Sequence, residues 1–269
     1  MNEPFKQSDE SFLHIENWQT LNPNLIAGFT TRNGGVSNSP FQTLNLGLHV
    51  ADEKDLVIEN RETLANKLDV SLRNWVSGEQ VHQANIAIIK DKDKGKGSVD
   101  YNGSIKGTDG LITNKKDVLL TAFYADCVPL FFFDPVSGYI GIAHAGWKGT
   151  VSRIAEKMVQ AFQNVGVMPE NLFIVIGPCI SQSVYEVDHN VVGHNDDEMR
   201  QRVTIQQKNN RYLLDLKQLN VEILLQSGVL RHNIEVTNYC TYNDEELFFS
   251  HRRDKGRTGR MLGFLGFKK

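Results

Sequence analysis

The sequence predicts an α+β fold in which mixed sheets are flanked by helices. Short segments rich in Ile, Val, Phe and Tyr, bounded by turn residues, crowd the middle of the chain. Three other segments carry apolar residues at helical spacing. These helices do not alternate steadily with the strands, as they would in a parallel sheet. The 269 residues suffice for a sizeable core, as one large domain or two small ones.

Nine segments have the composition of strands. They span residues 25–31, 84–90, 117–125, 129–134, 139–145, 172–177, 233–238, 247–252 and 259–267. The turn chemistry of residues 134–138, DPVSG, predicts that two of these strands form a hairpin. By contrast, residues 91–107 alternate charges and glycines and offer nothing to bury, which predicts a solvated loop.

Three helices are expected around these strands. Asp52 and Thr150 are suitable caps for the first two, the second ends at Gly166, and the third runs from about Asp215 to Gln226. Their apolar faces comprise Leu56, Val57, Leu64 and Leu68, then Ile154, Met158, Ala161, Phe162 and Val165, and finally Leu216, Leu219 and Ile223.

Composition excludes several classes of function. The chain has 29 basic and 32 acidic side chains, a net charge of −3, which argues against nucleic acid or an anionic membrane as a partner. The polar N-terminus lacks the apolar core of a signal peptide, and the apolar stretch 118–133 is interrupted by Asp126 and shorter than the ~18 residues of a membrane span. Three scattered cysteines make no disulfide framework. We therefore expect a soluble, cytoplasmic protein.

Three short segments each offer a candidate metal ligand: His82 in EQVHQAN, Cys127 in ADCVP and His144 in AHAGWKG. Two imidazoles and a thiolate can hold zinc and leave a fourth position for water. Small residues surround His144, which allows close approach of a ligand. The spacings of 45 and 17 residues match no compact zinc finger. Each residue also has an ordinary explanation, since a buried Cys packs and a His forms hydrogen bonds.

Two basic features could bind an anion. Arg32 precedes the Gly34–Gly35 pair, whose amides can form an anion nest, although a flexible loop with a surface arginine explains the same pattern. The second feature is the run SHRRDKGRTGR, which could be a solvated surface or a phosphate site. It contains Arg252, Arg253, Lys255, Arg257 and Arg260.

Taken together, these segments resemble one family closely. TTRNGGVS, LNLGLHV, EQVHQA, YADCVP, HAGWKGT, IGPCI, YEV and FFSHRRD…TGR occur in the family's order, from about Phe29 to Phe267. The family is the bacterial one once called multicopper polyphenol oxidoreductase or laccase-domain, now regarded as purine nucleoside phosphorylases with adenosine deaminase activity. HAGWKG together with ADCVP carries most of this resemblance.

The resemblance implies a single α/β/β/α-layered domain over residues 1–269, with residues 1–24 as a peripheral N-terminal segment. It implies a catalytic zinc, with copper as the alternative ion, held by His82, Cys127 and His144, and it places Arg32 in the pocket. The chain departs from many members at Lys148, where they have Arg, and at His251, where they have Tyr. Both departures concern substrate preference, because neither is a proposed ligand.

The implied reaction is phosphorolysis of adenosine, inosine, guanosine and methylthioadenosine to the free base and ribose 1-phosphate. Hydrolytic conversion of adenosine to inosine is implied as well. The partners are thus nucleosides and phosphate, with Arg32 as the candidate phosphate ligand. Asp126 is a weak candidate for the acid or base, since a regular strand would point it away from Cys127.

Two alternatives stay open at this point. A His/Cys site also binds copper, so a copper-dependent phenol oxidase is one, although a multicopper enzyme needs many more histidines and no His-x-His pair occurs. The other is a metal-stabilised binding module without catalysis, which would require a closed fourth coordination position.

Overall fold

The structure is a computed structural model that describes residues 3–194 and 196–268. Its body contains two six-stranded mixed sheets. In the first sheet the strand order is β1 (Phe5–Asp9), β2 (Phe12–Ile15), β3 (Leu25–Thr30), β15 (Met261–Phe267), β7 (Leu119–Tyr124) and β4 (Trp75–Ser77). In the second it is β14 (Ile234–Val236), β10 (Phe173–Ile176), β8 (Val128–Phe133), β9 (Ile140–Ala145), β6 (Gly110–Thr113) and β5 (Ile86–Ile88).

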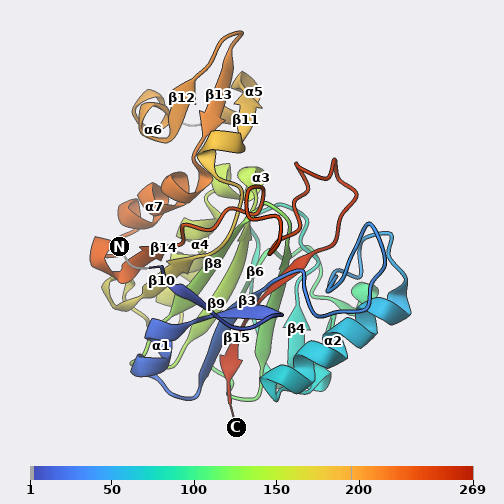
Figure 1. Cartoon of the computed structure of the whole chain (residues 1–269). Helices are drawn as coiled ribbons and strands as arrows, with labels where there is room; N and C mark the ends of the chain where they lie inside the picture. The colour runs from blue at the N-terminus through green and yellow to red at the C-terminus, as the bar shows by residue number, and fades with distance from the viewer. Residues whose placement is uncertain (1–2, 195, 269) are drawn as a thin grey trace.

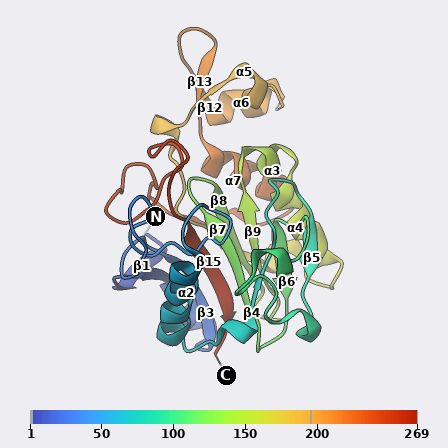
Figure 2. The same cartoon turned by 90° about the vertical axis from the view of Figure 1, so that its right-hand side faces the viewer.

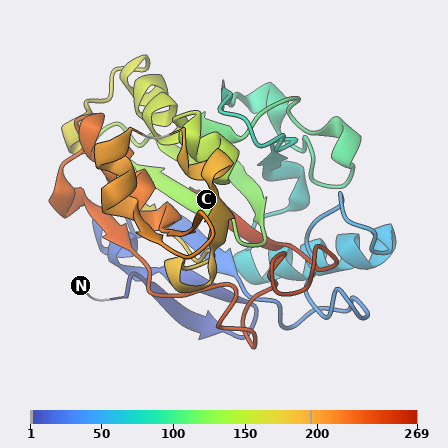
Figure 3. The same ribbon diagram turned by 90° about the horizontal axis from the view of Figure 1, so that it is seen from above.

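The helices cover the outer faces of these sheets, which gives the expected α/β/β/α layers. Helix α2 (Lys54–Leu68) covers the first sheet, and α4 (Ile154–Gln163) and α7 (Leu216–Gln226) cover the second, as Figure 2 shows from the side and Figure 3 from above. Apolar side chains such as Phe29, Phe131 and Ile142 fill the space between the sheets. The predicted fold class is therefore confirmed.

A third, three-stranded sheet projects from one end of the body (Figure 1). It consists of β11 (Glu186–Asp188), β13 (Arg211–Leu214) and β12 (Thr204–Gln206), with α5 (His189–Val192) and α6 (Asp197–Val203) beside it. None of these elements was predicted from the sequence. Their strands are three or four residues long, and β11 and β12 contain one apolar residue each, so most of this sheet lacks the buried apolar runs of the central strands of the body.

The N-terminal segment adds β1 and β2 to the edge of the first sheet, followed by α1 (Glu16–Leu21). It is peripheral in strand order, yet Phe5, Leu13, Ile15 and Trp18 are almost completely buried. This segment therefore contributes to the core between the sheets. Among the described residues, no helix combines the length and apolarity required to cross a bilayer.

The predicted hairpin is confirmed, because β8 and β9 pair antiparallel around the turn. The Asp134 carboxylate accepts hydrogen bonds from the backbone N–H groups of Val136 and Ser137. The predicted strand over 247–252 is wrong. Phe248 and Phe249 are buried, but the backbone there forms turns, in which Ser250 and Arg252 donate their N–H groups to the carboxylates of Asp254 and Asp126.

Two of the expected helix starts are also wrong. The first helix begins after Glu53, and the Asp52 carboxylate instead accepts hydrogen bonds from Ser37 and Asn45. Thr150 lies within a separate short helix, α3 (Trp147–Val151), and α4 starts after Arg153. The third helix follows the prediction, with the Asp215 side chain accepting the N–H of Gln218.

The expected solvated loop over 91–107 is only partly solvated. Short 3₁₀ turns occupy Asp91–Asp93 and Tyr101–Gly103, and Asp93, Ser98 and Ser104 are buried. The fully buried guanidinium of Arg61 explains this, since it donates hydrogen bonds to the carbonyls of Gly97 and Ser98. The loop is packed by a partner from α2 that its own composition cannot reveal.

Candidate metal centre

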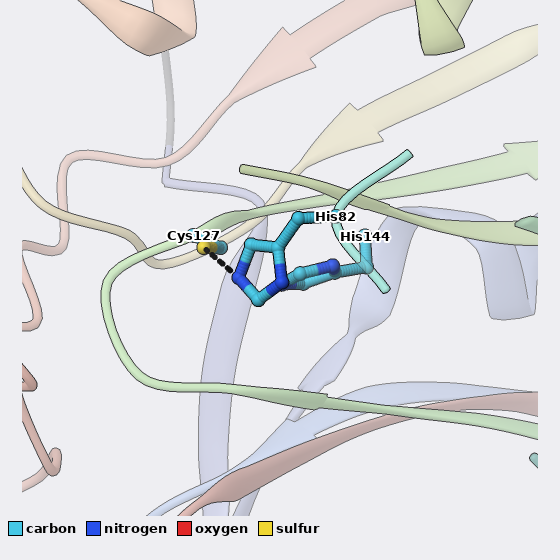
Figure 4. A group of neighbouring side chains, drawn as sticks. All are labelled: His82, Cys127 and His144. Carbon is cyan, nitrogen blue, oxygen red and sulfur yellow. Dashed lines mark hydrogen bonds between the residues drawn. The ribbon is translucent and has the colours of Figure 1, made fainter. Parts of the chain in front are cut away.

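The structure brings His82, Cys127 and His144 together (Figure 4). Each residue offers one ligand atom, and these atoms lie within 4.8 Å of one another. Cys127 Sγ is 4.0 Å from His82 Nε2, and the two imidazole rings stand nearly perpendicular, with centroids 4.7 Å apart. His144 is buried, Cys127 is partly buried and His82 is exposed. The cluster is therefore accessible from one side.

Three different elements supply these side chains. His144 is on β9, and Cys127 is in the tight turn between β7 and β8. His82 lies in the turn after β4, where its φ of 58° is in the left-handed region. The turn is held by the carboxylate of Asp109, which accepts the backbone N–H groups of Val81, His82 and Gln83.

Asp109 also orients the buried histidine. Its Oδ1 lies 3.1 Å from Nδ1 of His144, so the other ring nitrogen, Nε2, is free to act as a ligand. The Asp109 side chain is completely buried. Asp109 was not predicted from the sequence, because an aspartate directly before a short strand has no distinctive signal until the fold brings it to the other two segments.

Gly146 explains why small residues follow His144. A Cβ atom at this position would lie 2.9 Å from Cys127 Sγ and 3.1 Å from His82 Cδ2. Both distances are closer than ordinary van der Waals contacts. The absence of a side chain at Gly146 therefore leaves room for two of the candidate ligands to converge.

The electrostatics of the cluster favour a thiolate. Burial alone would raise the pKa of Cys127, but the charge of His144 and hydrogen bonds from both histidines lower it to about 6. Burial alone would lower the pKa of His144, whereas the negative charge of Cys127 and the hydrogen bond to Asp109 raise it to about 9. The protein therefore favours the deprotonated sulfur that a metal ion requires.

The donor set fits zinc. At metal–ligand distances of about 2.0–2.3 Å, the ligand atoms of a tetrahedral zinc are roughly 3.3–3.7 Å apart. The ligand atoms of the cluster lie within 4.8 Å of one another, and Cys127 Sγ is 4.0 Å from His82 Nε2, which is close to this spacing. Within residues 3–194 and 196–268, only these three neighbouring side chains form such a group of His, Cys, Asp or Glu. The three residues also line the adjoining cavity, and His82 is exposed.

This cavity has a volume of about 370 Å³, within the range of small-molecule sites. Aromatic side chains form the apolar part of its wall, and histidines and arginines supply polar groups. It is lined by His49, Gln80, His82, Phe123, Ala125, Asp126, Cys127, His144, Trp147, Ile180, Tyr185, His251, Arg252 and Arg260. His49 was not predicted as a site residue, although it belongs to the motif LNLGLHV.

Asp126 is in the cavity wall, but its carboxylate is engaged. It accepts hydrogen bonds from Thr241 Oγ1 and from the backbone N–H of Arg252, both at 2.7 Å. With a φ of 83°, Asp126 is in a turn and not in a regular strand, so the strand argument against it does not apply. Its contacts nevertheless give it a structural role, anchoring the segment that carries Arg252.

Arg32 does not reach this cavity in the described part of the chain. Its guanidinium donates to the carbonyls of Gln42 and Glu245 and lies over the ring of Phe249, 4.7 Å from the centroid. The resemblance implies that Arg32 lies in the pocket. The contacts of Arg32 do not support this expectation. Two residues differ from those of many family members. Lys148 is exposed over the Trp147 ring, and His251 lines the cavity.

Comparison with known proteins assigns most of the chain to one family. Residues 26–268 match the family model described as multi-copper polyphenol oxidoreductase laccase. The purine nucleoside phosphorylase YlmD of Bacillus subtilis (strain 168) is 44% identical over 276 residues, which cover 99% of this chain and 98% of that protein.

Two solved structures have the same fold. The hypothetical protein YfiH of Bacillus licheniformis superimposes with a TM-score of 0.96 at 41% identity, covering 99% of this chain and all of that one. YlmD of Geobacillus stearothermophilus superimposes with a TM-score of 0.94 at 39% identity, covering both chains completely.

Proposed function

The chain belongs to the multi-copper polyphenol oxidoreductase laccase family, and we propose that it is a purine nucleoside phosphorylase with a metal centre at His82, Cys127 and His144. The observation that carries this proposal is the convergence of these three ligand atoms, within 4.8 Å, on the wall of one cavity. The names of the similar proteins supply the reaction class.

The proposed substrates are inorganic phosphate and the nucleosides adenosine, inosine, guanosine and methylthioadenosine. The products are the free base and ribose 1-phosphate. Phe123, Trp147 and Tyr185 line the cavity and offer faces on which a purine can stack. Such stacking accepts several purines, because it does not depend on one pattern of ring substituents.

The chain's own residues hold and orient the centre. Asp109 fixes the His144 ring and the backbone around His82, and Gly146 leaves room for Cys127 and His82 to converge. Bound zinc would supply Lewis-acid catalysis and activate water at neutral pH, the chemistry that hydrolytic deamination of adenosine requires. We therefore propose adenosine deamination as a second activity of the same centre.

The family description names a different activity, polyphenol oxidation, which requires copper. The described residues contain one three-ligand group, whereas a multicopper site needs many more histidines. A binding module without catalysis would instead need a closed coordination shell. The exposed His82 and the cavity next to the cluster favour an open, catalytic position.

Product analysis tests this proposal. Zinc-loaded protein is incubated with each nucleoside, with and without phosphate, and a phenol is tested in parallel. We expect free base and ribose 1-phosphate only when phosphate is present, and slow formation of inosine from adenosine in its absence. Strong phenol oxidation with no base or inosine from any nucleoside would establish the oxidase instead.

A further inference from the structure

Arg260 lines the cavity, and part of its guanidinium has no partner in the described protein. It is partly buried, and its Nη1 donates hydrogen bonds to the carbonyls of Thr258 and Gly259 at 2.8 and 2.9 Å. No described carboxylate pairs with it, and Nε and Nη2 have no hydrogen-bond partner among the described residues. A guanidinium held in this way is a preorganised donor for an oxyanion.

The stem of Arg260 is fixed in place. Its backbone N–H donates to Asn45 Oδ1 at 2.9 Å, and its side chain lies against Gly47, where an added Cβ would be 2.7 Å from Arg260 Cγ. Burial lowers the pKa of Arg260, and the negative charges of Cys127 and Asp126 partly oppose this effect. Arg260 lines the same cavity as His82, Cys127 and His144, so one bound substrate can meet both the guanidinium and the cluster.

Two further guanidinium groups add positive charge without a carboxylate partner in the described chain. Arg252 lines the cavity, donates to the carbonyl of Glu186 and stacks on Tyr185. Arg61 lies fully buried behind the cavity wall, over the ring of Phe123, and donates only to backbone carbonyls. The one carboxylate in the cavity wall, Asp126, is already engaged by two donors. The excess positive charge suits a dianion.

We propose that Arg260 binds the attacking inorganic phosphate, with Arg252 on the same cavity wall adding positive charge. This assignment rests on the proposed function. In the reaction, an oxygen of HPO₄²⁻ forms a bond to the anomeric carbon while the glycosidic C–N bond breaks. The bonding electrons leave with the base, and the phosphate's proton is transferred to the base, so the products are ribose 1-phosphate and the neutral base.

The other arginines of the chain's basic features are unsuited to this role. Arg253 forms an ion pair with Asp254 and donates to three backbone carbonyls. Arg257 is exposed and outside the described cavity lining. Arg32, the residue that the sequence favoured for phosphate, uses its guanidinium on carbonyls and on Phe249. Of the two readings of the basic run, the phosphate site thus applies to Arg260 and Arg252.

Titration calorimetry with inorganic phosphate tests the assignment without depending on turnover. We expect Arg260→Gln to weaken phosphate binding about tenfold or more, the usual scale for losing a charge-assisted contact. Arg260→Lys keeps a positive charge but lacks the fork, and should fall between the wild type and Arg260→Gln. Arg257→Gln is the matched control, with the same charge change in the same segment, and should bind within about twofold of the wild type.

Three results would overturn the assignment: no phosphate binding by the wild type, equal binding by wild type and both Arg260 variants, or a tenfold loss in Arg32→Gln with none in Arg260→Gln. The phosphate dependence of nucleoside cleavage separates this failure from failure of the proposed function. Phosphorolysis with an unchanged KM for phosphate in Arg260→Gln overturns the assignment alone. Arg260-dependent phosphate binding, with no base released from any nucleoside, overturns the phosphorylase proposal alone.

Discussion

The carboxylate of Asp109 lies 3.1 Å from Nδ1 of His144 and is completely buried. The same carboxylate accepts three backbone N–H groups from the turn that carries His82. One side chain therefore positions two of the three candidate ligands. Partners of this kind fix the orientation of a metal-binding histidine and strengthen its interaction with the ion.

Asp109→Asn should weaken metal binding by about 10–100-fold. An asparagine offers only one acceptor oxygen, so its NH₂ group would face a backbone N–H or the His144 ring. Competition with a chromogenic zinc chelator measures the change. The control is Asp134→Asn, another buried carboxylate that accepts backbone N–H groups, located in the β8–β9 turn. Equal zinc affinity in the two variants would contradict the positioning role of Asp109.

Gly146→Ala should reduce activity strongly, by roughly 100-fold, because misplacing reacting groups by about an ångström has effects of that size. The added methyl group would meet Cys127 Sγ at 2.9 Å, and the ligands would have to move apart. Nucleoside cleavage and zinc content are measured together. Gly103→Ala is the control, since its Cβ would have no neighbour closer than 3.8 Å. Unchanged zinc content and turnover in Gly146→Ala would refute this explanation of the glycine.

The thiol of Cys127 should ionise near pH 6 in metal-free protein, well below its ordinary value of 9.0. Because His144 stabilises the charged form, the thiolate persists as the pH is lowered until about pH 6. Its absorbance at 240 nm follows the titration, and Cys127→Ser provides the baseline. Cys179 should not contribute, because burial raises its pKa to about 12. A wild-type transition centred near pH 9 would show that the ion pair with His144 does not form.

Arg61→Lys should destabilise the fold by about 1–3 kcal/mol. The guanidinium bonds three carbonyls, those of Leu46, Gly97 and Ser98, and an ammonium cannot reach all of them with the same geometry. Urea denaturation measures the loss, and Arg73→Lys on the exposed surface serves as the control. If Arg61→Lys unfolds at the same urea concentration as the wild type, the hydrogen bonds from Arg61 to the buried carbonyls do not stabilise the fold.

The central strands of the body were predictable because they are apolar runs. β7, β8, β9, β10 and β15 are almost entirely buried, so hydrophobicity alone identifies them. The same criterion predicted a strand at 247–252, where Phe248 and Phe249 are buried without pairing. It also missed β1, β2 and β4 of the body and β11, β12 and β13 of the third sheet, which are only three to five residues long. The sequence predicts which residues are buried, but the pairing of backbone strands depends on tertiary contacts.

The candidate site was predictable only in part, for a related reason. Cys and His have a metal-binding chemistry of their own, so residue type and local sequence made His82, Cys127 and His144 candidates, and the family resemblance implied that they bind the metal. Asp109 and His49 acquire their roles from neighbours far along the chain. The arginines illustrate the same limit, because Arg32 and Arg260 differ in their contacts and not in their local sequence chemistry.

The central claim is that His82, Cys127 and His144 together bind one metal ion per chain. The most direct test is metal analysis by mass spectrometry on zinc-supplemented wild-type protein and on the three single alanine variants, after removal of free metal. We predict close to one zinc per wild-type chain and almost none in any variant, with circular dichroism spectra unchanged, since an open site contributes little to folding. Full zinc occupancy in folded Cys127→Ala protein would contradict the claim.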